Sequence, residues 1–191
     1  EYQTQIALQL GFLDQGHKRA SEQMMQTYYR AARITSQLNS LLLDSLRQYI
    51  YSPIPSSPQD LDNDFYLQNN QICMRHPQVF AQNPSAILKL FLWLQQERGI
   101  QSIQAATQRA LWQARVLLNR DFRKSNAHRQ LFMQILRQPR GVTRVLRRMN
   151  QFGILGRYLQ KKKKIVGQMQ HDLFHVYTVD EHILMVLRNL R

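Results

Sequence analysis

Three histidines within twelve positions, His171, His175 and His182, are the residues whose type and spacing best suit chemistry in this chain. A neutral imidazole nitrogen is a common ligand of divalent metals. On a helix, the spacing of His171 and His175 places both rings on one side, as two ligands of one metal require. The apolar residues between and after them favour a second interpretation, in which these two histidines hydrogen-bond backbone or carboxylate groups in a helical junction. We prefer the second interpretation for this pair.

His182 stands at the expected start of a helix. Thr178 and Glu181 have the T-x-x-E spacing of a capping box, in which a hydroxyl and a carboxylate each satisfy a backbone N–H group. Apolar residues then recur at helical spacing, at Ile183, Val186, Leu187 and Leu190. The sequence therefore predicts that His182 is held on the first turn of a packed helix.

The segment Gly167–His182 closely resembles the start of the HD phosphohydrolase domain in the family of bacterial bifunctional PII uridylyltransferase/uridylyl-removing enzymes. The resemblance implies that His182 is the first ligand of a divalent metal, Mg²⁺ or Mn²⁺. Such a metal polarises a phosphodiester and lowers the pKa of the attacking water. The resemblance places the other ligands, including the H-D dyad, beyond Arg191. His171-Asp172 lies upstream of the first ligand and is not assigned the role of that dyad.

The resemblance extends into the middle of the chain. Four segments are similar to the helical domain that joins the nucleotidyltransferase and HD domains of the family: Phe91–Gln96, Ala105–Thr107, Ile135–Thr143 and Arg148–Leu159. One departure follows Leu159, where the family usually has proline and this chain has Gln160 and four lysines. We expect a long helical segment at 1–52, a Pro/Ser-rich linker at 53–63, the helical central domain at 64–166 and the beginning of a truncated HD domain at 167–191.

Enzymes of this family transfer UMP from UTP to a tyrosine of the nitrogen-regulatory protein PII and also remove it by hydrolysis. The resemblance therefore implies UTP and PII as partners, and glutamine as an effector through C-terminal ACT domains that this sequence lacks. The Gly-Ser motif of the transferase does not occur in the chain. Asp60, Asp62 and Asp64 alternate, but they follow a proline-rich stretch and are interpreted as turn and hairpin-entry residues. We expect the connecting domain of a bacterial cytoplasmic enzyme, with neither catalytic site complete and no activity of its own.

The chain is strongly basic. Its 191 residues include 26 Lys and Arg against 12 Asp and Glu, which gives a formal charge of +14 at pH 7. This charge attracts polyanions, so the competing hypothesis is a basic helical module that binds nucleic acid or protein without catalysis. The basic residues are spread over many expected helix faces rather than gathered in one aromatic-lined groove, which makes nucleic acid the less favoured partner.

Arg140 and Arg144 flank Gly141 at the expected start of a helix, where backbone N–H groups favour an anion. One hypothesis is that these arginines contact the phosphate of UTP or of the uridylyl group. In the alternative, which we prefer, they cap neighbouring carbonyl groups and pair with acidic helices. The remaining histidines, His17, His76 and His128, have no partner pattern and are interpreted as surface residues.

Two further features bear on the compartment. No apolar run approaches the roughly 18 residues that a membrane-spanning helix needs. The single Cys73 excludes an internal disulfide, which fits a reducing cytoplasm.

Helical periodicity dominates the rest of the sequence. Apolar residues from Met24 to Tyr49 step by three and four, which predicts one helix of about eight turns with a single buried face. The prolines that follow end it. Asn69-Asn70 predicts a tight hairpin near residues 64–75, because Asn tolerates positive φ. Short helices follow, with N-caps expected at Asn83, Ser102 and Ser125. The expected fold is mainly α, an antiparallel helical bundle with at most one small β-hairpin.

Overall fold

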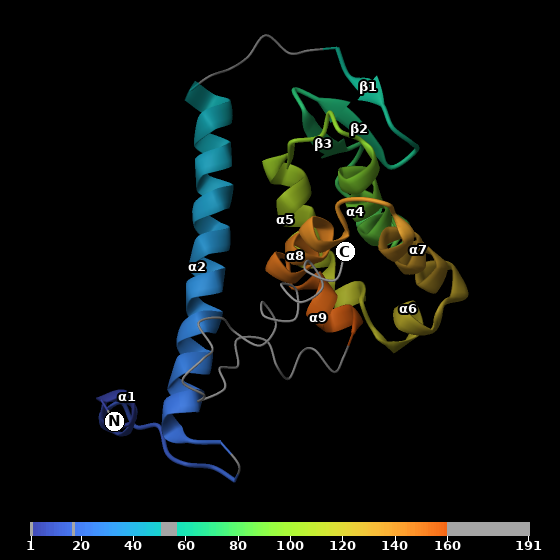
Figure 1. Ribbon diagram of the computed structural model, residues 1–191. Helices are drawn as coiled ribbons and strands as arrows, with labels where there is room; N and C mark the ends of the chain where they lie inside the picture. Colours follow the sequence, from blue (N-terminus) through green and yellow to red (C-terminus); the bar gives the residue numbers. More distant parts are fainter. Residues whose placement is uncertain (1, 17, 51–56, 160–191) are drawn as a thin grey trace.

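Helices dominate the fold, as the sequence predicts. The computed structural model describes residues 2–16, 18–50 and 57–159. Within these residues a long helix, α2, stands beside a body that contains one small sheet and most of the shorter helices (Figure 1). The expected class, mainly α with a small amount of β-structure, is confirmed.

The long helix begins after a short one. Helix α1 spans Tyr2–Gln9 and α2 spans Ala20–Ile50, 31 residues in all. At the start of α2 the carboxylate of Asp14 accepts a hydrogen bond from the backbone N–H of Ala20 at 2.6 Å. This contact satisfies one of the N–H groups that every helix start leaves without an internal partner. The single long helix predicted for Met24–Tyr49 is confirmed.

The predicted burial of one face of α2 is wrong for most of its length. Ala20 is buried, but Ile34, Leu38 and Leu42 are 52%, 55% and 63% exposed. Among the described elements, α2 makes its main contacts with α1 and with α5, which spans Ala105–Ala114. The spacing of apolar residues predicts that a helix has an apolar face, but that face is buried only where another surface covers it.

The sheet is larger than the single predicted hairpin. Its strands are β1 (Gln59–Asp60), β2 (Phe65–Gln68), β3 (Gln71–Met74) and β4 (Ser102–Ile103), arranged in the order β1-β2-β3-β4. Strands β2 and β3 form the predicted antiparallel hairpin, and Asn69 and Asn70 turn it at φ values of 49° and 60°. Strand β1 pairs antiparallel with β2, and β4 pairs parallel with β3. The two-residue strand β1 lies inside the segment 53–63 that was predicted as linker.

The expected N-caps are right at one helix and wrong at two. Helix α7 (Asn126–Arg137) follows Ser125 at the predicted position, although the Ser125 side chain makes no capping hydrogen bond. Helix α4 (Ala86–Gln96) starts after Ser85, because a turn intervenes in which the backbone oxygen of Asn83 accepts from the N–H of Ala86. The side-chain amide of Asn83 donates to Asp64. Ser102 precedes α5 but belongs to β4, since pairing with β3 supplies its segment with backbone partners. Local side-chain chemistry does not reveal such long-range pairing.

The core lies around α4. The other short elements are α3 (Val79–Gln82), the 3-10 turn η1 (Arg115–Leu117), α6 (Arg120–Lys124), α8 (Val142–Gln151) and α9 (Ile154–Tyr158). Helix α4 contacts α7 and α8, and it buries six apolar side chains, including Phe91 at 0% exposure.

Gly141 and Gly153 adopt left-handed φ values of 77° and 70° directly before α8 and α9. Glycine accepts this conformation without the steric cost that other residues incur, so both sharp turns suit it.

Asp62 and Asp64 are turn and hairpin-entry residues, as predicted, whereas Asp60 ends strand β1 and pairs with Arg75. One oxygen of Asp62 accepts from the backbone N–H groups of Asp64 and Phe65, both at 2.8 Å, and the other accepts from Trp93 Nε1 at 2.7 Å. The buried carboxylate of Asp64 lies 3.1 Å from the ammonium of Lys89. These contacts join the hairpin to α4.

In the part of the chain that the structure describes, no helix combines the length and the apolar character that crossing a membrane requires.

Candidate functional site

The predicted metal ligand His182 lies outside the described residues, as do His171 and His175. Within 2–16, 18–50 and 57–159, no group of three or more His, Cys, Asp or Glu side chains is placed to hold a metal ion. The metal site at His182 therefore stays a prediction.

Arg140 lies in the turn between α7 and α8, and Arg144 lies in the first turn of α8; both are next to the end of α4. The guanidinium of Arg144 donates to the carbonyl oxygen of Leu94 at 3.3 Å. The carbonyl oxygen of Arg140 accepts from the side-chain amide of Gln95 at 3.0 Å. The contact of Arg144 is of the carbonyl-capping kind that the preferred alternative describes. Contact of either arginine with a phosphate stays a prediction.

His128 is not the simple surface residue that the sequence suggested. Its Nε2 lies 2.9 Å from the hydroxyl oxygen of Ser85, and its Nδ1 lies 2.9 Å from the carbonyl oxygen of Phe122. The ring also stacks on Phe122, with 3.8 Å between centroids. Because a carbonyl oxygen only accepts, Nδ1 carries the proton and Nε2 of a neutral ring accepts from Ser85. His128 thereby joins α7 to the start of α4, whereas His76 is exposed as predicted.

The most developed candidate site is a cavity of about 350 Å³ between α2 on one side and η1, α8 and α9 on the other. Four arginines line it: Arg30 and Arg33 from α2, Arg115 from η1 and Arg157 from α9. None of the described lining residues is acidic. Sequence reasoning missed this group because segments far apart along the chain contribute its arginines. We refer to it as the arginine cavity.

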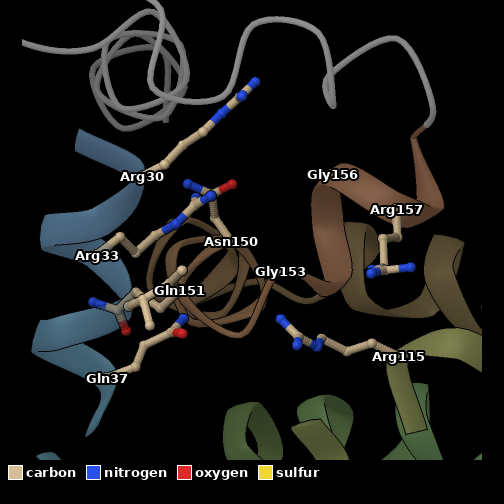
Figure 2. Close-up of a pocket in the computed structure, with 10 residues that line it drawn as sticks. Arg30, Arg33, Gln37, Arg115, Asn150, Gln151, Gly153, Gly156 and Arg157 are labelled. Carbon is tan, nitrogen blue, oxygen red and sulfur yellow. The ribbon is translucent and has the colours of Figure 1, made fainter. Parts of the chain in front are cut away.

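Figure 2 shows how these side chains are oriented. Arg33 extends from α2, Arg115 extends from the opposite side toward Gly153, and Arg157 extends from α9. Gly153 permits this approach, because a Cβ atom there would lie only 3.2 Å from a guanidinium nitrogen of Arg115. Arg30 extends away from Arg115 at the edge of the cavity.

Two contacts with Trp112 restrain Arg115. Its Nε donates to the carbonyl oxygen of Trp112 at 2.8 Å, and its guanidinium carbon lies 4.2 Å from the centre of the Trp112 ring. Partial burial lowers the pKa of Arg115, and the nearby positive charges of Arg157 and Arg33 lower it further. The positive charges of Arg157 and Arg33 therefore act on the guanidinium of Arg115.

A second cavity of about 260 Å³ adjoins the first. Arg33, Gln37 and Gln151 line both cavities, so the two cavities are neighbours along α2. The second cavity adds the aromatic rings of Trp112 and Phe152. Trp112 remains 46% exposed, an unusual degree for so large an apolar ring. We refer to this space as the aromatic cavity.

Comparison with known protein families identifies the family of this chain. Residues 65–158 match the family model described as the third domain of uridylyltransferase GlnD. Residues 1–43 match a second model, described as GlnD PII-uridylyltransferase. Together the two models match more than half of the chain. The chain belongs to the GlnD uridylyltransferase family. Residues from both matches line the arginine cavity, because α2 lies largely in the match over residues 1–43, and α8 and α9 lie in the match over residues 65–158.

Curated relatives of this GlnD chain carry the name bifunctional uridylyltransferase/uridylyl-removing enzyme. Those from Chromobacterium violaceum, Thiobacillus denitrificans and Nitrosospira multiformis are 50%, 47% and 45% identical to it over 191 residues. Each match covers 100% of this chain, and the chain spans 22% of the length of each relative. No solved structure matches the chain.

Proposed function

We propose that this chain is the helical region of an enzyme that transfers UMP from UTP to a tyrosine of PII and hydrolyses the product. The observation that carries the proposal is the similarity over the full 191 residues to relatives named for both activities. The described residues support a connecting role. Their buried core packs around α4, which suits a structural region between other domains.

The proposal includes the parts of the reaction that lie outside the described residues. By resemblance, His182 is a ligand of Mg²⁺ or Mn²⁺ in the hydrolytic site, with further ligands supplied by sequence beyond Arg191. Such a metal activates water for attack on the uridylyl phosphodiester. PII and UTP are the proposed partners, glutamine the proposed effector, and the bacterial cytoplasm the proposed compartment.

The test uses the protein that contains this sequence together with its flanking regions, with PII from the same organism as acceptor. We expect UTP-dependent labelling of PII and metal-dependent release of UMP from the labelled protein, and neither activity from the 191-residue chain alone. His182→Ala is expected to abolish release while transfer continues. His76→Ala serves as the control, because His76 is exposed and has no proposed role.

Two results would count against the proposal. Retained uridylyl release after His182→Ala would remove His182 from the hydrolytic site. Absence of both activities in the longer protein, together with tight binding of the chain to nucleic acid at near-physiological salt, would favour the competing binding module.

A further inference from the structure

We propose that the exposed apolar face of α2 is the docking surface for an amphipathic helix of the uridylyltransferase region that precedes this sequence in the longer protein. Leu38, Leu42 and Leu46 form this face, with Ile34 at its edge, and we refer to the four residues as the α2 stripe. The inference rests on the proposed function in one respect only, which is that the chain is part of a longer uridylyltransferase.

The α2 stripe has the form of a helix-packing surface. Its members recur at every fourth position, and each is more than half exposed. Side chains four residues apart form a ridge on a helix, and such a ridge packs into the groove of a second helix. A row of large exposed apolar side chains marks an interaction site, whereas single exposed leucines are ordinary. The stripe therefore suits the apolar face of another helix.

The body of the molecule meets α2 on its other side (Figure 1). The nine positions from Arg33 to Leu42 make about two and a half helical turns, which places these two residues on opposite sides of α2. Arg33 and Gln37 line both the arginine cavity and the aromatic cavity. Apart from Ile34, the α2 residues that line these cavities are polar. The shorter helices thus face the polar side of α2, and the stripe needs a different cover.

Residues 1–43 have little apolar core of their own. In the described part of this segment, the buried side chains are those of Ala7, Ala20, Ser21 and Gln26. None of them is a large apolar side chain, and a segment of this length rarely folds alone without one. Burial of the stripe supplies the apolar contacts that α1 and α2 do not give each other.

The family matches indicate what covers the stripe. Residues 1–43 match the GlnD PII-uridylyltransferase model, whereas the body, residues 65–158, matches the third domain. Helix α2 therefore belongs largely to a different domain from the helices beside it. The chain spans 22% of the length of its relatives, so most of each relative lies outside the matched part. The remainder of the uridylyltransferase region is the occupant that would complete the core around α2.

Maleimide labelling tests whether the stripe is covered. Leu42→Cys is introduced into the 191-residue chain and into the longer protein, and modification by N-ethylmaleimide is followed on the peptide that contains the new thiol. We expect this thiol to react at least tenfold more slowly in the longer protein. Val116→Cys, at an exposed apolar position on η1, is the matched control and should react within twofold of the same rate in both proteins. Equal slowing at both positions, or rapid reaction of the thiol at position 42 in both proteins, would overturn the proposal.

Photo-cross-linking identifies the occupant. Benzoylphenylalanine replaces Leu38 in the longer protein, and a mixture of isotopically labelled and unlabelled protein separates links within one molecule from links between two. We expect a link within one molecule to a peptide that precedes Glu1. A link to residues 160–191 would assign the stripe to another part of this chain, and a link between molecules would assign it to a second copy. Either result would overturn the proposal.

Hydrogen exchange of the unaltered proteins keeps the test independent of substitutions. We expect the amides of residues 34–46 to exchange at least tenfold more slowly in the longer protein than in the 191-residue chain, because packing on a second side suppresses local opening of the helix. Residues 86–96, the buried helix α4, are the internal reference. Equal protection of residues 34–46 in both proteins would overturn the docking surface even if the variants failed to fold.

Activity measured on the same longer protein separates this proposal from the proposed function. Slow exchange in residues 34–46 without transfer or release of UMP would support the docking surface and count against the proposed function. Full activity with unprotected residues 34–46 would overturn the docking surface alone.

Discussion

The guanidinium of Arg115 lies over the indole ring of Trp112, 4.2 Å from the ring centre, and its Nε donates to the carbonyl oxygen of the same residue. A cation–π pair at a partly exposed site contributes about 0.5–1 kcal/mol. We expect Trp112→Leu and Arg115→Gln each to lower the free energy of unfolding by about 1 kcal/mol. A double-mutant cycle, measured by urea denaturation, should give a coupling of roughly 0.5 kcal/mol. Strictly additive losses would mean that the two side chains do not interact.

The ion pair of Asp64 and Lys89 should matter more to stability than the ion pair of Asp60 and Arg75. Asp64 is 7% exposed and also accepts from Asn83 at 2.7 Å, whereas the Asp60 side chain is 81% exposed. Removing one partner of a fully buried ion pair lowers the free energy of unfolding by about 3–5 kcal/mol. For Asp64 we expect a smaller loss of about 2 kcal/mol, because its partner Lys89 is partly exposed.

The comparison of Asp64→Asn with Asp60→Asn tests this difference. We expect Asp64→Asn to lower the free energy of unfolding by about 2 kcal/mol, and Asp60→Asn to change it by less than about 1 kcal/mol. Thermal unfolding at two salt concentrations measures both. Equal effects would show that burial does not distinguish the two pairs.

Cys73 gives the chain a pH dependence at the alkaline end. The thiol is 2% exposed, and burial raises its pKa above the ordinary value. The native state therefore keeps this proton at a pH where the unfolded chain has begun to release it. The stabilisation is complete below the unfolded thiol pKa of about 8.5 and is lost as the pH rises toward the higher folded value.

Cys73→Ala should therefore lose less stability than the unaltered chain between about pH 8 and pH 10. The difference between the two unfolding curves reports the thiol together with its coupling to Tyr66, because burial and then Cys73 raise the pKa of Tyr66. A thiol reagent should also react with native Cys73 at pH 8 much more slowly than with the chain in concentrated urea. Identical pH slopes, or equal reaction rates, would contradict the burial of this thiol.

The sequence predicted the parts of the fold that depend on local patterns. The long helix through Met24–Tyr49 and the hairpin turn at Asn69-Asn70 follow from spacing and from the φ preference of Asn. Strands β1 and β4 could not be predicted from their two-residue lengths, since only pairing with β2 and β3 defines them. The same long-range pairing explains why Ser102 is not a helix cap.

The candidate functional residues also differ in whether the sequence could predict them. The family resemblance predicted His182 from one continuous phrase, and that residue lies outside the described ones. The arginine cavity had no comparable signal, because Arg33, Arg115 and Arg157 are separated along the chain and meet only through packing. The single local hint was the placement of Gly153 and Gly156 beside Arg157, where small residues allow close approach of other groups.

The contact of Arg144 with Leu94 separates the two hypotheses for the turn at Gly141. If Arg144 acts as a carbonyl cap, Arg144→Ala should lower the free energy of unfolding by about 1 kcal/mol, and the exposed Arg140→Ala should change it by less than 0.5 kcal/mol. Under the phosphate hypothesis both substitutions should instead raise the KM for UTP in the longer protein. Urea denaturation and steady-state kinetics on the same variants distinguish the outcomes.

The exposed apolar face of α2 yields the last prediction. Leu38 and Leu42 are more than half exposed, so their replacement by serine should change the free energy of unfolding of the 191-residue chain by less than about 0.5 kcal/mol each. Phe91→Ala, at a fully buried position on α4, should cost about 3–5 kcal/mol and calibrates the measurement. Urea denaturation combined with sedimentation equilibrium measures stability and association together. A loss above about 1.5 kcal/mol for Leu42→Ser would show that another surface covers this face in solution, and a simultaneous drop in sedimenting mass would identify that surface as a second copy of the chain.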